Sequence, residues 1–164
     1  MSAQENKILI RVLIGILCAA AIFFVLRIFL CTPECQVRKF ILSGKKVVEA
    51  RNTLTGASMI SANYYDKYGN DRDSMIYCIR KAFTYYKSIR IQILKMDIKL
   101  DESKSKAEVE VEALVTCRGE QGIEKIFKED KGRVRLVIIK ENKKWLLAEV
   151  EFLDAATIMG ATIF

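Results

Sequence analysis

The sequence of 164 residues contains no histidine. Histidine is the commonest general base and metal ligand in proteins, and it activates the nucleophile in Ser-His and Cys-His pairs. Its absence excludes all of these arrangements. The five cysteines do not replace it, because their spacing is not that of a zinc site. We therefore expect no metal, no cofactor and no catalytic residue.

The cysteines do not show whether the protein lies in an oxidising or a reducing compartment. Cys18 lies inside an apolar run, Cys31 and Cys35 stand four residues apart just after it, and Cys78 and Cys117 are isolated. A disulfide between Cys31 and Cys35, or between Cys78 and Cys117, is one alternative in an oxidising compartment, and free thiols are the other. The sequence alone does not decide between them.

The sequence also lacks a concentrated basic patch. Beyond residue 35 lie 24 of the 27 Lys and Arg and 18 of the 20 Asp and Glu, so a moderate positive excess is spread along the chain. These cations alternate with apolar residues, whereas a nucleic-acid footprint clusters them with aromatic residues. We expect no nucleic-acid partner. A solvated face is the simplest interpretation, and weak attraction to anionic lipid headgroups is the alternative.

What the sequence does contain is one long apolar run from Ile8 to Leu30, in which Arg11 and Arg27 are the only charged residues. A helix of this length rises roughly 34 Å, enough to cross a hydrocarbon core about 30 Å thick. Both arginines lie near an end of the run, so their side chains can reach the headgroups. The run predicts an uncleaved transmembrane anchor over 8–30. Ile8 and Leu30 end it, Arg11 and Arg27 lie just inside these ends, and a short tail over 1–7 precedes it.

Two other interpretations of the run fit less well. A signal peptide cleaved after Ala19–Ala21 would leave the apolar stretch Ile22–Leu26 exposed at the start of a domain. A lipoprotein site at Cys31 needs a small residue before the cysteine, and Leu30 is not small.

The orientation of the anchor rests on opposing indications. More Lys and Arg follow the run than precede it, which by the positive-inside rule would place the domain in the cytoplasm. A short tail, one span and a folded domain is nevertheless the usual design of exported, signal-anchored bacterial proteins. We expect a single-pass protein of the cell (inner) membrane with its domain on the outer, periplasmic face.

Beyond the run, the pattern predicts one soluble α+β domain over 31–154, with helices before strands. Thr32, Pro33 and Glu34 form a typical helix start, and apolar residues at helical spacing continue to about Asn52. We expect a break over 53–56 and a short helix over 57–63. A third helix begins near 71–74 and carries an apolar stripe: Met75, Ile76, Ile79, Ala82, Phe83 and Tyr86.

From Ile89 the apolar period changes from 3.6 to 2, which predicts an antiparallel sheet. The apolar parity slips once between Ile93 and Lys95, as at a β-bulge. A second strand follows over 106–118, then a charged loop over 120–131, and last a hairpin.

We place the hairpin strands over 132–140 and 144–153, with a three-residue loop between them. Pairing Arg133 with Glu151 and Arg135 with Glu149 sets opposite charges face to face on one side of the sheet. Trp145 packs at this hairpin. The apolar tail over 155–164 is too short to span a membrane; it docks on its own domain or serves as a partner segment.

This order of elements resembles the nuclear transport factor two-like superfamily, whose domain is a cystatin-like cone of helices on a curved sheet. The resemblance covers about residues 36–154. Three stretches carry it: the loop over 64–72, the end of the third helix over 83–86, and the hairpin over 137–153 with its central Trp145.

The resemblance implies a cone whose open end is an enzyme pocket, a ligand pocket or a docking surface. It implies the following pocket or partner-binding residues: Tyr64, Tyr65, Asp66, Phe83, Tyr86 and Trp145. In isomerases and dehydratases of the superfamily a carboxylate base or a tyrosine acts in the pocket, a role open here to Asp66 with Tyr85 or Tyr86. A lone Asp in a loop is more often a solvated or capping residue.

Three functions follow, and they differ in class. The leading one is a non-catalytic, membrane-anchored interaction or assembly module that binds a partner protein or a second copy of itself. The second is a carrier or sensor of a hydrophobic small ligand in the cone. The third is a small-molecule isomerase or dehydratase, which we favour least because its base would be a lone Asp in a loop. The fold does not choose among the three, since folds of this type host unrelated activities.

Overall fold

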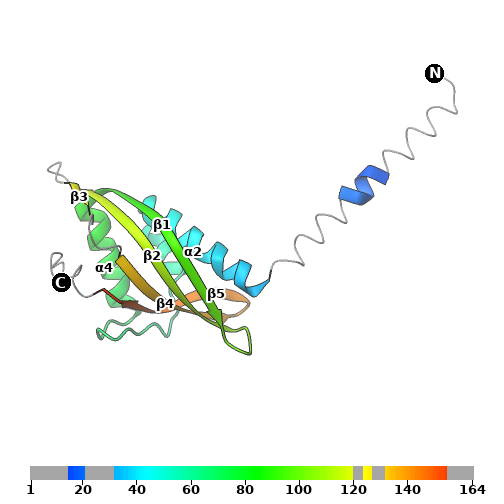
Figure 1. The fold of residues 1–164 in the computed structure, drawn as a ribbon. Coiled ribbons are helices and arrows are strands. Elements are labelled where there is room, and N and C mark those ends of the chain that lie inside the picture. The colour runs from blue at the N-terminus through cyan, green and yellow to red at the C-terminus, as the bar shows by residue number, and fades with distance from the viewer. Residues whose placement is uncertain (1–14, 21–31, 120–123, 127–131, 155–164) are drawn as a thin grey trace, which may run out of the picture.

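The computed structural model describes residues 15–20, 32–119, 124–126 and 132–154. Helices precede strands, so the α+β class is confirmed (Figure 1). The elements are α2 (Pro33–Glu49), α3 (Thr53–Ser58), α4 (Arg72–Tyr85), β1 (Tyr86–Leu100), β2 (Lys106–Gly119), β3 (Glu124–Ile126), β4 (Gly132–Glu141) and β5 (Lys144–Phe152).

The expected anchor falls mostly outside the described residues, and so do all four residues that bound it: Ile8, Arg11, Arg27 and Leu30. Within that run, residues 15–20 are helical and exposed. Over the part of the chain that the structure describes, no helix combines the length and apolar composition that a membrane span needs. The tail over 1–7 and the apolar tail over 155–164 also lie outside this part.

Helix α2 begins at the predicted place. The Thr32 side chain accepts a hydrogen bond from the Cys35 backbone N–H at 3.3 Å, and Pro33 occupies the first turn. The helix ends at Glu49, because Arg51 then takes a left-handed conformation with φ of 52°.

The short helix lies earlier than predicted. We expected a break over 53–56, but α3 forms over Thr53–Ser58 and overlaps it. The cause is Asn52, whose Oδ1 accepts a hydrogen bond from Thr55 N at 3.0 Å and caps the new helix. Asn52 therefore starts α3 instead of ending α2.

Helix α4 runs directly into the sheet. Asp71 caps its first turn by accepting from Ser74 N at 2.9 Å. Tyr86, expected on the helical stripe, is instead the first residue of β1. The strand therefore starts three residues before Ile89.

The main path of the sheet is β1-β2-β4-β5, and every pairing in it is antiparallel. The register of β1 on β2 shifts between Ile93 and Lys95, which confirms the predicted bulge. One strand was not predicted: β3 pairs with the end of β2 inside the expected charged loop over 120–131.

The predicted hairpin register is wrong. Glu141 pairs with Lys144, so the loop has two residues, Asn142 and Lys143, which both have positive φ as a type I′ turn requires. A second register shift between Val137 and Ile138 then restores the parity.

As a result Arg135 faces Glu151, not Glu149, and their side chains meet at 2.9 Å. Opposite charges still face each other, as the argument from charge requires. The register differs because the two-residue turn and the bulge act together.

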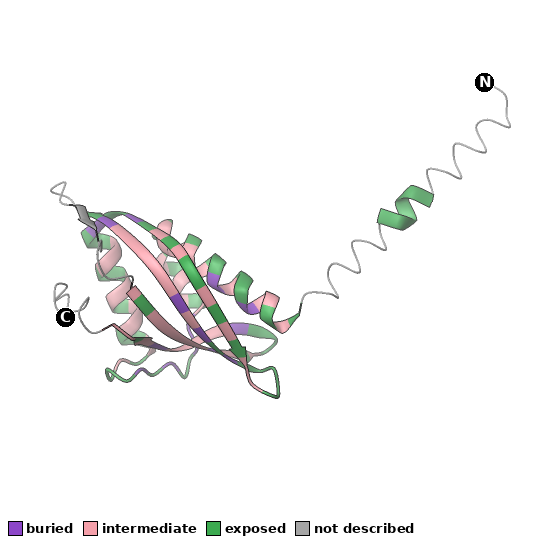
Figure 2. Cartoon of the chain, in the orientation of Figure 1, coloured by how far each residue is buried: buried purple, intermediate pink, exposed green. Residues whose placement is uncertain are grey.

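The helices α2, α3 and α4 lie on one face of the sheet, and no described helix covers the other face (Figure 1). Alternate strand residues point to the helices, and the most deeply buried of them meet Val37 and Ile41 of α2. This core contains Val37, Ile41, Ala107, Val109, Val111, Ile138 and Trp145. Figure 2 shows buried residues along α2 and the strands that it covers.

Replacing Ile138 with Ala should lower the free energy of unfolding by about 3 kcal/mol, because its side chain is fully buried in this core. Ile139→Ala is the matched control: Ile139 follows in the same strand, points to the outer face and is half-buried, so its loss should be less than half as large. Denaturant unfolding of the full chain in detergent, followed by fluorescence of the single tryptophan, measures both. Equal losses would contradict the assignment of the two faces.

Candidate functional site

Asp66 is the centre of the loop over 64–70, and the residue is only 2 % exposed. Its Oδ1 accepts hydrogen bonds from the backbone N–H groups of Tyr68 and Asn70, both at 2.9 Å. Its Oδ2 accepts from Tyr64 Oη and Asn70 Nδ2, both at 3.0 Å. The loop closes because Gly69, with φ of 85°, donates its N–H to the Asp66 carbonyl.

These hydrogen bonds determine the protonation of the loop. Burial raises the pKa of Asp66, but the donors of Asn70, Tyr64 and Tyr68 outweigh it and hold the pKa below its usual value. Burial and the neighbouring carboxylate raise the pKa of Tyr64, so its hydroxyl stays protonated. A general base needs a pKa close to the operating pH, whereas this geometry suits a carboxylate that organises a loop.

Tyr65 does not share this environment. Its side chain is 64 % exposed, while its backbone N–H donates to Ala148 O of β5 at 3.2 Å. The loop is also tied to the end of β5 by Lys67, whose ammonium lies 2.7 Å from Glu151, and by the ring contact of Tyr68 with Phe152. The tyrosine that sequence places beside Asp66 therefore faces solvent.

Phe83 and Tyr86 lie at the other end of α4. Tyr86 is buried with Ile89 and Cys117, and Phe83 packs against the same cluster. Arg51, which the sequence analysis did not single out, donates from Nη1 to Phe83 O at 3.2 Å and Tyr86 O at 3.0 Å. This guanidinium fixes the junction where α4 becomes β1.

Trp145 occupies a third place. Its ring is 7 % exposed within the core under α2, and its Nε1 donates to Gln36 Oε1 at 3.2 Å. Lys140 Nζ lies 5.6 Å from the ring centroid.

The predicted site residues thus belong to separate packing clusters. Tyr64 lies with Ile60 and Val150, Tyr86 with Ile89 and Cys117, and Trp145 with the residues under α2. Among the predicted residues, the structure joins only Tyr64 and Asp66 by a side-chain hydrogen bond. Cys78 and Cys117 are free thiols and do not form the disulfide considered above. Cys31, of the other pair considered, lies outside the described residues.

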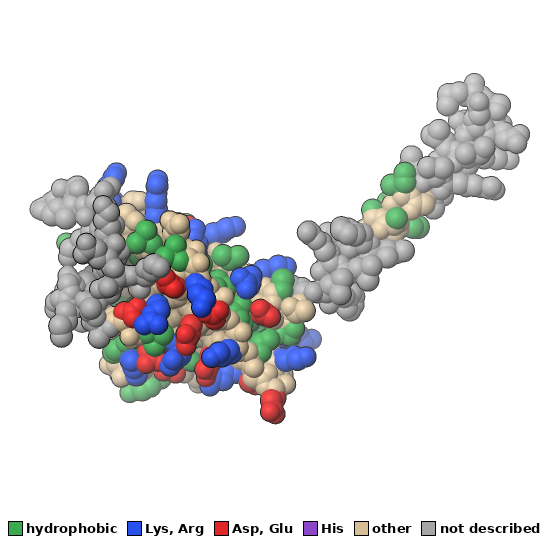
Figure 3. Space-filling model, in the orientation of Figure 1, with side chains coloured by type: hydrophobic (Ala, Val, Ile, Leu, Met, Phe, Trp, Pro, Cys, Tyr) green, Lys and Arg blue, Asp and Glu red, His purple; other side chains and the backbone are tan. Residues whose placement is uncertain are grey.

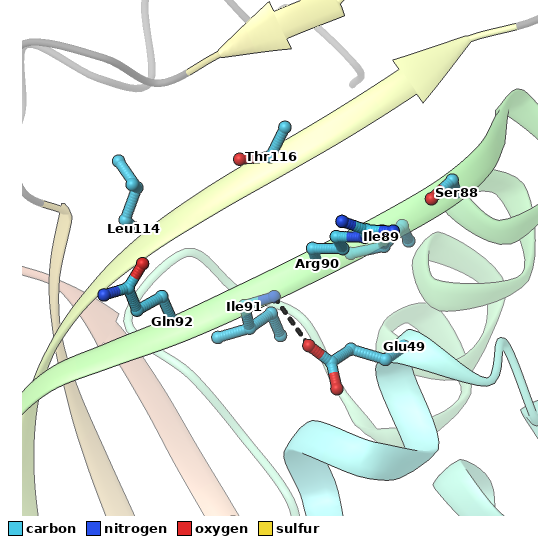
Figure 4. A pocket seen from close by; sticks show the side chains of 8 residues that line it. All are labelled: Glu49, Ser88, Ile89, Arg90, Ile91, Gln92, Leu114 and Thr116. Atoms are coloured by element: carbon cyan, nitrogen blue, oxygen red, sulfur yellow. Dashed lines mark hydrogen bonds between the residues drawn. The ribbon is translucent and has the colours of Figure 1, made fainter.

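A depression of about 530 Å³ lies along β1, between the end of α2 and the neighbouring strand β2 (Figure 4). It is lined by Glu49, Ser88, Ile89, Arg90, Ile91, Gln92, Leu114 and Thr116. Glu49 reaches into it from the end of α2, and its Oε1 accepts a hydrogen bond from the backbone N–H of Ile91 at 2.8 Å.

The electrostatics of Glu49 explain its position. The Ile91 N–H lowers the pKa of Glu49; burial opposes this, and Lys45 Nζ, 3.0 Å from Oε2, lowers it further. Sequence analysis did not identify this residue, although one indication was present: Glu49 ends α2, where the helix dipole disfavours an anion. An acid at that position needs a donor from elsewhere in the fold.

The outer face of the sheet carries ion pairs. Glu151 binds both Lys67 and Arg135, and Arg135 also reaches Glu110 at 3.4 Å. Figure 3 shows Asp and Glu interspersed with Lys and Arg over this face.

No protein-family model matches the sequence, and no curated protein matches it. Solved structures do resemble it. One is a protein from Novosphingobium aromaticivorans that is named as a scytalone dehydratase. It has TM-score 0.64 and 13% identity, and the match covers 71% of this chain and 80% of that chain. Aln2 from a Streptomyces species has TM-score 0.63 and 12% identity over 77% and 93% of the two chains.

A third is a nuclear transport factor 2-like superfamily protein from Salmonella enterica, with TM-score 0.61 and 12% identity over 74% of this chain and 89% of that chain. At such low identity the likeness concerns the fold alone. The domain therefore has the nuclear transport factor two-like fold, as the resemblance in the sequence predicted.

Replacing Asp66 with Asn should lower the free energy of unfolding at neutral pH by about 2 kcal/mol, because a charged acceptor of several buried hydrogen bonds is lost. Asp97→Asn is the matched control, since the Asp97 carboxylate is half-exposed and pairs only at the surface with Lys95. Denaturant titration of both variants measures the difference, and equal effects would show that the loop does not depend on Asp66.

The same carboxylate predicts a pH dependence. Because its folded pKa lies below the unfolded value of about 4, its stabilisation is complete above that value and is lost as pH falls through the folded pKa. Between about pH 5 and pH 2 the native protein should therefore lose stability more steeply than Asp66→Asn. Parallel curves would contradict a lowered pKa.

Proposed function

We propose that this protein is a membrane-anchored, non-catalytic binding module whose cone presents a surface to a partner protein or to a second copy of itself. The anchor is the run over 8–30, and the domain stands on the outer face of the cell (inner) membrane. The chain enters the domain at Thr32 and Pro33, directly after the run.

The observation that carries the proposal is the use of the buried polar groups. Among the described residues, Ser61 and Asp66 are the polar side chains that are buried. Asp66 holds the loop over 64–70, and Ser61 donates to Glu141 Oε1 at 2.7 Å while accepting from Asn63 N at 3.0 Å. Both groups stabilise loops, so the polar side chains that can contact another molecule are those on the surface.

A second candidate rests on the inner face of the sheet. Ile93, Met96 and Ile98 point to the helices but stay half-buried, which suits a carrier or sensor of a hydrophobic small ligand. An isomerase or dehydratase would need Asp66 as its base, and the four donors around that carboxylate oppose this role.

The anchor is tested by extraction of membranes at alkaline pH, with the chain expressed in a bacterial cell. The full chain should stay with the membranes, and the double variant Ile16→Asp, Leu17→Asp should move to the soluble fraction, because two charges at the centre of a span are costly. The control is Leu42→Asp, Leu54→Asp, which changes two exposed leucines of the domain and should stay with the membranes. Release of both variants, or of neither, would contradict the anchor.

Native mass spectrometry of the full chain, released from detergent, distinguishes the two candidate functions. A self-associating module should appear at a multiple of the chain mass, whereas a carrier should appear as one chain with added lipid. Partner binding predicts a single chain without added mass. A tightly held small ligand would overturn the leading proposal.

A further inference from the structure

We propose that the edge of β1 between Ser88 and Gln92 binds an extended acidic segment of a partner protein by strand addition. This inference rests on the proposed function, since it specifies the partner's chemistry and the surface that binds it.

The first observation is the exposed edge. Among the described strands, β1 ends the sheet and pairs on one side only, with β2. The other edge, β5, is covered by the segment over 59–65: Ser61 N donates to Leu147 O at 2.8 Å, and Leu147 N to Met59 O at 2.9 Å. An uncovered edge strand presents backbone groups that pair readily with another chain.

The second observation is the depression that runs along this strand. Five consecutive β1 residues line it, together with Glu49 on the side of the free edge and Leu114 and Thr116 of β2 on the other side, so it follows β1. Its volume of about 530 Å³ lies within the range of small binding sites. Beyond it, the bulge between Ile93 and Lys95 and the charges of Lys95 and Lys99 limit pairing of the rest of the strand.

The third observation is the group that occupies the edge now. The Ile91 N–H is taken by the Glu49 carboxylate, an acceptor from another element of the same chain. Figure 4 shows this carboxylate facing the strand from the end of α2. An incoming strand would replace it with a backbone carbonyl and release Glu49 to Lys45, which already lies 3.0 Å away.

The fourth observation is charge. The segments over 80–92 and 114–119 contain five cations and no Asp or Glu: Arg80, Lys81, Lys87, Arg90 and Arg118. The fold gathers them, because Ser88 pairs with Arg118 and α4 ends directly at β1, where Arg51 also binds. Two acids from other segments lie among these cations: Glu49 in the depression and Glu124 of β3, which pairs with Arg118. The cations outnumber them. Figure 3 shows Lys and Arg along this upper margin of the domain, in contrast to the mixed charges over the centre of the sheet. The partner that complements this end is acidic.

The position also suits a tethered module. Glu49 lies at the opposite end of α2 from Pro33, so about 25 Å of helix separates the depression from the point where the chain leaves for the membrane. A partner bound at this edge would lie at the far end of α2 from the proposed anchor.

The test uses the full chain in detergent and a labelled heptapeptide of alternating Glu and Val, with an alternating Lys and Val peptide as the charge control. Fluorescence anisotropy should show saturable binding of the acidic peptide and none of the basic one. Arg90→Glu should weaken binding at least tenfold. Lys99→Glu makes the same charge change on the same strand outside the depression, and should weaken it less than twofold.

Two further variants test the binding site itself: Glu49→Gln tests the charge beside the strand, and Ile91→Pro tests pairing with the backbone of the edge. Glu49→Gln should strengthen binding about threefold, because it removes a like charge at the edge. Ile91→Pro removes the edge N–H and should abolish binding while the Trp145 fluorescence stays native; Arg90→Glu and Glu49→Gln decide the matter if this variant unfolds.

Equal losses in Arg90→Glu and Lys99→Glu would overturn the proposal, as would equal binding of a twelve-residue oligothymidylate, which would indicate a surface for any polyanion. Failure of the acidic peptide to bind would overturn only the proposal that the β1 edge binds an acidic segment. Anchoring and self-association are measured separately by extraction and by mass, so the proposed function would remain standing.

Discussion

Helix α2 is the constraint on which the rest of the domain depends, because it connects the two edge strands of the sheet. Near its start, Gln36 accepts from the indole of Trp145 on β5. In its middle, Val37 and Ile41 cover the strands between. At its end, Glu49 accepts from Ile91 of β1, and Arg51 then binds the carbonyl groups at the junction of α4 and β1. A single helix thus contacts both edge strands and the strands between them.

This arrangement divides the chemistry of the molecule between interior and surface. The buried polar groups of the described residues hold loops: Asp66 closes the one over 64–70, and Ser61 joins the β4–β5 turn through Glu141. The surface carries paired charges over the centre of the sheet and an excess of cations near the start of β1. A protein arranged in this way is suited to binding other molecules through its exterior, which is the function we propose for it.

Much of the fold could be predicted because its determinants are local. The Thr32 cap, the α4 stripe, the change of period near Ile89 and the parity slip at Ile93 each depend on residues close in sequence. The errors arose where a local choice depended on a distant one. Asn52 caps α3 instead of ending α2, and the two-residue turn at Asn142 works only with the bulge after Val137.

By itself, the sequence determined the α+β class, the order of helices and strands, the inward set of apolar residues and the lack of an imidazole group. Each of these follows from residue type and periodicity alone. Only the tertiary structure decided that Asp66 is saturated with donors, that Tyr64, Tyr86 and Trp145 lie in separate clusters, and that Glu49 occupies the edge of β1. These results depend on contacts between segments tens of residues apart, and the protonation and accessibility of a side chain follow from such contacts.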